Sequence, residues 1–198
     1  MNIVRTIFLA LGAVFALVLI GVGIFGYLVT GPAPTYDGAE VEVSHEATAS
    51  LDLKIEAFRQ DIDEASAGDM VGLLITEEEA TSKLHDLAQN GELPTEMNYI
   101  QIHFDDGTLY GSAIVDLIID IQVAVQAEIG VNDQGKPDIT IKSFNFGRLI
   151  IPTTLVGNVM LALMKEMEER LESLPFELQE ITIENGEISI TARVKESL

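Results

Sequence analysis

The chain has 198 residues, with 11 basic and 32 acidic side chains, so its formal net charge is −21. This charge argues against a nucleic-acid partner, because such partners are held by basic side chains that neutralise phosphates. The absence of cysteine excludes disulfides, thiolate metal sites and cysteine nucleophiles. With 47% hydrophobic residues, the chain is too apolar for a disordered acidic tail and suits one globular domain plus a lipid-soluble segment.

The amino-terminal segment predicts a membrane anchor. Residues 7–28 are 22 apolar residues and glycines in a row, which as a helix span about 33 Å, enough to cross a bilayer. A cleaved signal peptide is the alternative, but its apolar region is usually only about 7–15 residues long. The small residues after the run, Gly31 and Ala33, are each followed by proline, which generally blocks signal peptidase.

The charges on either side of this run predict its orientation. Arg5 precedes the run and acidic residues follow it, so the amino terminus is expected in the cytoplasm and the main domain outside the cell membrane. The sequence thus predicts a single-pass protein with a cytoplasmic tail (1–6), a transmembrane anchor (7–29), a linker (30–38) and an extracytoplasmic domain (39–198).

Two amphipathic helices open the predicted domain. Apolar residues recur at helical spacing within residues 44–67, with Ser44 as a plausible N-cap. A second helix is expected from Glu77, because Thr76 and Glu79 have the spacing of a capping box. Asn90 with Gly91 is expected to end this helix in a left-handed conformation.

The rest of the domain is predicted to be mostly strand. Every odd position within residues 109–129 is apolar or small, which indicates one long strand that must bend. Hairpin turns are expected at residues 105–107, 132–137 and 185–186. A switch of apolar parity near Ser143 predicts a bulge or a change of face. The predicted fold class is α+β, in which a transmembrane helix precedes a curled antiparallel sheet of long strands packed on amphipathic helices.

A third helix is expected between residues 152 and 174. Its first half is apolar on nearly every side, which indicates that sheet, lipid or a hydrophobic ligand encloses it. Its methionines are either ordinary core or one wall of an apolar groove. The candidate ligand-binding residues are Val156, Met160, Leu163, Met164 and Met167, against Leu117, Ile119, Ile121 and Val123 on the long strand.

No residue pattern predicts catalysis, a cofactor or a metal. The three histidines have no zinc-binding spacing. Glu77, Glu78 and Glu79 could suggest a metal cluster, but carboxylates in the first turn of a helix are explained by the helix dipole. Asp116 and Asp120 would lie about 14 Å apart on one continuous strand, too far to share an ion, and either could pair with Lys142. We therefore expect no enzyme.

The order of elements resembles a known group of proteins. Residues 73–88, the segment NYIQIHFDDGTLYGSAIV, the helix opened by Ile150-Ile151-Pro152 and the closing ITIENGEISITARV resemble YpmS-like and LmeA-like membrane-anchored bacterial proteins. Such proteins are similar to tubular lipid-binding (BPI-like) domains. The resemblance implies that the domain binds a lipid or another apolar ligand at the cell envelope, without a cofactor. The alternative is a non-enzymatic interaction module that holds an envelope protein partner.

Overall fold

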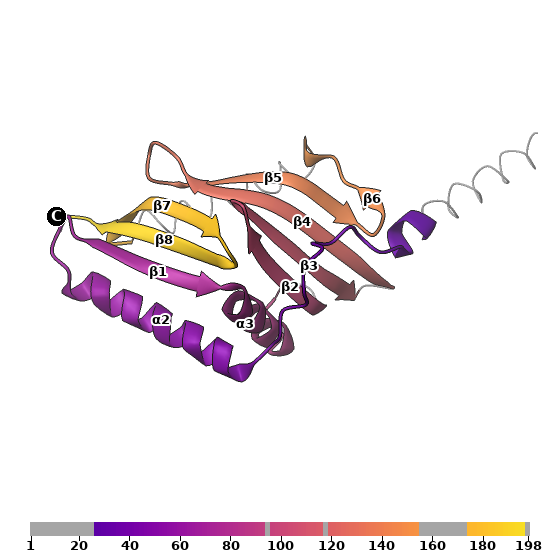
Figure 1. Cartoon of the computed structure of the whole chain (residues 1–198), viewed down its shortest axis with the longest axis horizontal. Coiled ribbons are helices and arrows are strands. Elements are labelled where there is room, and N and C mark those ends of the chain that lie inside the picture. Colours follow the sequence, from indigo (N-terminus) through magenta and orange to yellow (C-terminus); the bar gives the residue numbers. More distant parts are fainter. Residues whose placement is uncertain (1–25, 94–95, 117–118, 155–173, 197–198) are drawn as a thin grey trace, which may run out of the picture.

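A computed structural model describes residues 26–93, 96–116, 119–154 and 174–196. In this part of the chain, eight strands form two antiparallel sheets, with helices α2 and α3 beside them (Figure 1). The three-stranded sheet has the order β1-β8-β7 and the five-stranded sheet the order β2-β3-β4-β5-β6. The elements are α2 (His45–Glu64), β1 (Met70–Thr76), α3 (Glu77–Gln89), β2 (Met97–Asp105), β3 (Thr108–Asp116), β4 (Asp120–Val131), β5 (Pro137–Phe146), β6 (Leu149–Ile150), β7 (Phe176–Glu184) and β8 (Glu187–Val194).

The predicted fold class is wrong. The described chain is mostly β-sheet, with two antiparallel sheets in place of one curled sheet packed on several helices. The expected transmembrane helix is not supported either: no helix among the described residues is long and apolar enough to cross a membrane. Residues 7–25 of that expected span, and residues 155–173 of the expected third helix, lie outside the described part.

Both amphipathic helices begin where the sequence predicted. The Ser44 side chain accepts a hydrogen bond from the Ala47 N–H and caps α2. The Thr76 hydroxyl accepts from the Glu79 N–H at 3.2 Å, and the Glu79 carboxylate accepts from the Thr76 N–H at 3.0 Å. This reciprocal pair is the predicted capping box of α3. Gly91, at φ +68°, provides the expected left-handed residue just beyond α3.

The expected long strand is a hairpin instead. Strands β3 and β4 pair with each other in antiparallel register, so that Asp116 lies directly opposite Asp120. The predicted 14 Å separation along one strand is therefore wrong. The sequence did not reveal the turn because residues 117–119 are leucine and isoleucines, with no glycine, proline or asparagine to mark it. Lys142 pairs with neither aspartate; its Nζ forms an ion pair with Oε2 of Glu128, on the neighbouring strand β4, at 2.6 Å.

The three predicted turns and the bulge are confirmed. Asp106 and Gly107 both have positive φ, as do Asn185 and Gly186, and two consecutive left-handed residues are what a type I′ hairpin turn requires. The third turn lies between β4 and β5. The register of that pair shifts between Gln126 and Ala127, opposite residues 141–143. This extra residue in β5 produces the change of parity that the sequence shows.

Two apolar clusters hold the sheets together. One joins α2, β1, β7 and β8 around the fully buried Ala192. The other joins the sheets to each other: Ile102 and Phe104 of β2 pack against Ile183 of β7 and Ile188 of β8. Backbone hydrogen bonds reinforce this junction, from the Gly107 N–H to the Ile183 carbonyl and from the Gly186 N–H to the Phe104 carbonyl. Helix α2 runs along β1, and α3 lies where the two sheets meet (Figure 1).

Candidate functional site

The five-stranded sheet has one apolar face, fixed by the register of its strands. Val115 pairs with Ile121, Val123 with Phe146, and Val125 with Phe144. Paired residues point to the same side of a sheet, and every second residue along each strand joins them. We call this set the apolar face: Ala113, Val115, Ile121, Val123, Val125, Phe144 and Phe146.

Burial is uneven across the apolar face. Val115 is 7% exposed and Ile121 is 4% exposed, whereas Val123, Val125, Phe144 and Phe146 are only half-buried. The cluster that joins the two sheets lies farther along the sheet, around Ile102 and Phe104. Apolar side chains near the centre of a sheet are usually covered more completely than this. The half-buried part of the apolar face is therefore apolar surface that an additional apolar group could cover.

The structure brings together only part of the predicted groove. Ile121 and Val123 lie on the apolar face, as the alternation indicated. Ile119 does not lie on the apolar face: it lies between β3 and β4 and is 47% exposed. The other predicted groove residues lie outside the described part of the chain: Leu117, Val156, Met160, Leu163, Met164 and Met167.

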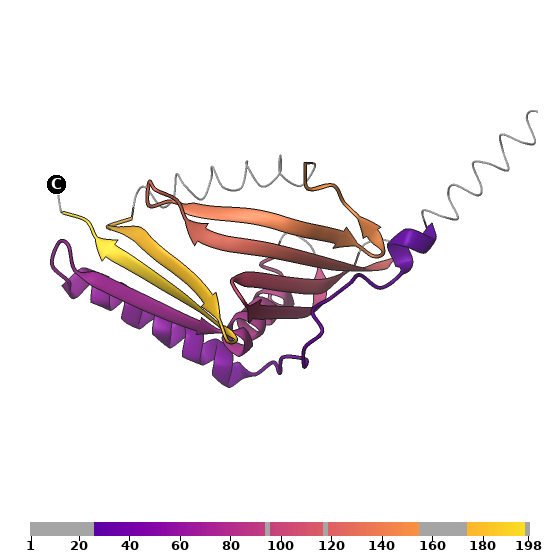
Figure 2. The same cartoon turned by 45° about the horizontal axis from the view of Figure 1, so that its top comes forward.

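The opposite face of the same sheet is polar and is crossed by an amino-terminal segment. We call residues 33–41 the strap; they have no regular secondary structure. The strap passes in front of the five-stranded sheet on its way to α2 (Figures 1 and 2). Along this path the Ala33 N–H donates to Oε1 of Gln122 at 3.2 Å. Farther along, Gln101 both accepts from the Val41 N–H and donates to the Val41 carbonyl.

Tyr36 fixes the middle of the strap. Its ring packs against His103 and against Tyr110, each with a centroid distance of 4.8 Å. Its hydroxyl donates to Oδ2 of Asp105 at 3.0 Å. This hydrogen bond, with partial desolvation and nearby carboxylates, raises the pKa of Tyr36 above its ordinary value. The predicted linker thus has specific contacts along its length.

Two adjoining grooves lie beside the strap. The first has a volume of about 310 Å³ and lies between the strap and strands β2, β3 and β4. The second, of about 710 Å³, lies between residues 40–43 and the start of β2. Glu40, Tyr99 and Gln101 line both. The polar residues at the even positions of β3 and β4 are the sequence signal for this face, but they do not reveal that the strap crosses it.

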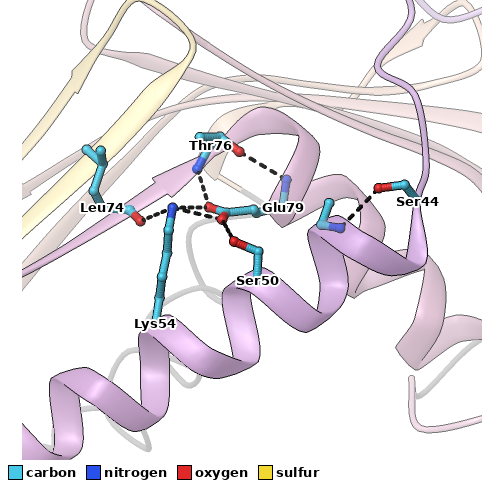
Figure 3. A network of polar contacts seen from close by, with 7 residues as sticks. Ser44, Ser50, Lys54, Leu74, Thr76 and Glu79 are labelled. Atoms are coloured by element: carbon cyan, nitrogen blue, oxygen red, sulfur yellow. Dashed lines mark hydrogen bonds and ion pairs between the residues drawn. The ribbon is translucent and has the colours of Figure 1, made fainter.

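The carboxylates at the start of α3 have structural partners, and those of Glu79 are shown in Figure 3. Glu79 has a 6% exposed side chain and contacts Lys54 Nζ at 2.7 Å and the Ser50 hydroxyl at 2.7 Å. Burial raises the pKa of Glu79, but hydrogen bonds from Lys54, Ser50 and the Thr76 N–H outweigh it and hold that pKa below the usual range. Lys54 also donates to the Leu74 carbonyl, so the network ties α2 to both β1 and α3.

The other two glutamates of this turn also reach beyond their own helix. Glu77 accepts from the Phe104 N–H at 2.6 Å, and Glu78 accepts from the Ser44 hydroxyl at 3.0 Å. The helix dipole is therefore only part of their role. His103 is 8% exposed and faces Glu77 at 3.6 Å. No group of acidic residues and histidines that could hold a metal ion occurs among the described residues.

Comparison with known proteins gives no relative: no family model, no curated protein and no solved structure matches this chain. The two faces of the five-stranded sheet are therefore the features that bear on function.

Proposed function

We propose that this protein is a non-enzymatic binding domain that holds a lipid or another apolar ligand on the apolar face of its five-stranded sheet. The observation that carries this proposal is the half-burial of Val123, Val125, Phe144 and Phe146 on a face that presents only apolar side chains. Covering this surface with an acyl chain favours binding by about 25 cal/mol for each square ångström of apolar area buried. The resemblance to tubular lipid-binding proteins points to the same ligand class.

The length of strands β4 and β5 supports an elongated ligand. Strand β4 has 12 residues and β5 has 10, both longer than the most common strand length of about 5–6 residues, and the bulge between them increases the local twist. The apolar face runs along two long strands, so an extended hydrocarbon chain would cover more of it than a compact molecule would. The net charge of −21 opposes an anionic headgroup, so a neutral or zwitterionic lipid fits best.

The test is lipid occupancy of the full chain. Native mass spectrometry and lipid extraction report what the purified protein carries, and vesicles of phosphatidylcholine containing NBD-labelled phosphatidylcholine report uptake. Val123→Gln places an amide on the apolar face, where an unpaired polar group costs about 1–3 kcal/mol. We expect uptake to weaken about tenfold, since 1.4 kcal/mol corresponds to one decade in affinity.

Leu53→Gln is the matched control. Leu53 is 71% exposed on α2, which packs beside the other sheet, so the same substitution there should leave uptake unchanged. Equal lipid uptake by folded Val123→Gln and Leu53→Gln variants would refute the site. A wild-type chain that carries no lipid and takes none from vesicles would refute the function. Cross-linking in cells would then test the interaction module instead.

A further inference from the structure

We propose that the grooves beside the strap form a second binding site, on the polar face of the five-stranded sheet, for an extended neutral oligosaccharide. Side chains alternate between the two faces of the sheet along β3 and β4, so Ser112, Gln122 and Gln126 lie on the face opposite the apolar one. Val125 of the apolar face also borders the first groove. The proposal stands on the polar face alone and does not depend on lipid binding.

The lining has the hydrogen-bonding chemistry of a hydroxyl-rich ligand. The side chains of Gln122, Gln126 and Ser112 line the first groove, and Asn98 lines the second. Amides and hydroxyls can both donate and accept, as the hydroxyls of a sugar do. Neither the Ser112 hydroxyl nor the Gln126 side-chain amide has a hydrogen-bond partner among the described residues, so both groups can bond to a ligand.

The charges of the lining argue against an ionic ligand. Glu40 and Glu42 are its acidic residues, and neither lysine nor arginine is among the described lining residues. A phosphate or carboxylate would therefore find no cationic partner. Two carboxylates in a chain with 32 acidic residues do not mark a cation site. Amide and hydroxyl groups outnumber them in the lining.

Tyr99 supplies an aromatic surface at the point where the two grooves meet. Its φ is +50°, a left-handed conformation that a tyrosine rarely adopts, and it lies at the irregularity where β2 shifts register against β3. Irregularities of this kind redirect a side chain out of the sheet and recur beside binding sites. The side chain is 71% exposed and lines both grooves. An exposed aromatic ring of this kind offers a flat apolar surface against which the C–H face of a pyranose ring can pack.

The shape of the site favours several sugar rings over one. The grooves of about 310 and 710 Å³ share Glu40, Tyr99 and Gln101, so they form one open channel along the strap. The strap holds its place through the paired hydrogen bonds between Gln101 and Val41, at 2.7 and 3.2 Å. The channel wall is therefore formed before a ligand arrives, which reduces the ordering cost of binding.

The chain provides its own reporter for this site. It has no tryptophan and four tyrosines, and three of these, Tyr36, Tyr99 and Tyr110, line the first groove. Tyrosine emission of the full chain is titrated with maltotetraose and with N-acetylchitotetraose, and calorimetry gives the dissociation constants. We expect saturable binding of at least one tetrasaccharide. Tetralysine serves as the comparison probe for a cationic ligand.

Two variants test the residues. Tyr99→Asn removes the ring but keeps a residue that tolerates a left-handed backbone, and Gln126→Ala removes a free amide. We expect each to weaken tetrasaccharide binding at least fivefold. Tyr27→Ala is the control, because Tyr27 is 62% exposed and lies outside both grooves. The proposal is overturned if neither tetrasaccharide binds, if tetralysine alone binds, or if Tyr99→Asn binds as tightly as Tyr27→Ala.

Discussion

The Lys54–Glu79 pair allows a quantitative test of the junction between α2, β1 and α3. Lys54→Met removes the ammonium group and keeps most of the apolar stem. Glu79 would then remain at 6% side-chain exposure with its charge held only by hydrogen bonds from Ser50 and the Thr76 backbone. Removing one partner of a fully buried pair costs about 3–5 kcal/mol. Because the Lys54 side chain is 36% exposed, solvent screens the pair, and we expect a loss of about 2 kcal/mol.

The matched control uses the other lysine–carboxylate pair between the same two helices. Lys83 lies 2.8 Å from Asp52, but their side chains are 27% and 53% exposed. Lys83→Met should therefore cost no more than about 1 kcal/mol. Urea denaturation of the full chain, followed by circular dichroism, measures both changes. The corresponding fall in Tm for Lys54→Met is about 4–8 °C in a chain of this size.

The pH dependence gives an independent check of the same pair. The pKa of Glu79 is lowered in the folded state, so its contribution to stability is complete above the unfolded pKa of about 4.3 and is lost as the pH falls through the lower folded value. The difference in stability between wild type and Lys54→Met should be largest at pH 7 and shrink below about pH 4. If Lys54→Met and Lys83→Met cost the same at pH 7, burial is not what makes the first pair important.

Two further substitutions test how the elements are joined. Thr81 is fully buried, and its hydroxyl accepts a hydrogen bond from the Ile102 N–H at 3.0 Å. Thr81→Val should therefore lower the free energy of unfolding by about 1–3 kcal/mol and speed hydrogen exchange of the Ile102 amide. Thr140→Val, at an exposed strand position, should leave both quantities unchanged. Gly147 has φ +61°, and a Cβ added there would overlap the Val29 carbonyl. Gly147→Ala should therefore displace residues 26–36 and expose them to limited proteolysis. Gly130→Ala is the control, because a Cβ added at Gly130 meets open space. Unchanged cleavage in the Gly147 variant would contradict the contact between this segment and the β5–β6 turn.

Local signals in the sequence were sufficient for the starts of both helices and for the last hairpin. Ser44 and the Thr76–Glu79 pair placed the starts of α2 and α3, and the Asn185-Gly186 turn placed the last hairpin. These features depend on the backbone preferences and hydrogen bonds of residues within about four positions of one another, so neighbouring residues alone determine them. The parity change near Ser143 likewise revealed the bulge, because the alternation of a strand is a local property.

Only the tertiary structure decided which strands pair and which segments cover the faces of the sheets. The Asp116–Asp120 hairpin could not be predicted, because residues 117–119 carry no turn signal in the sequence. The proposed site on the polar face was missed because it forms where the strap crosses the sheet, and Val41 of the strap lies 60 residues before its partner Gln101 in the chain. Alternation in a sequence shows which residues share a face of a strand. It does not show which distant segment covers that face, because packing between distant segments determines this.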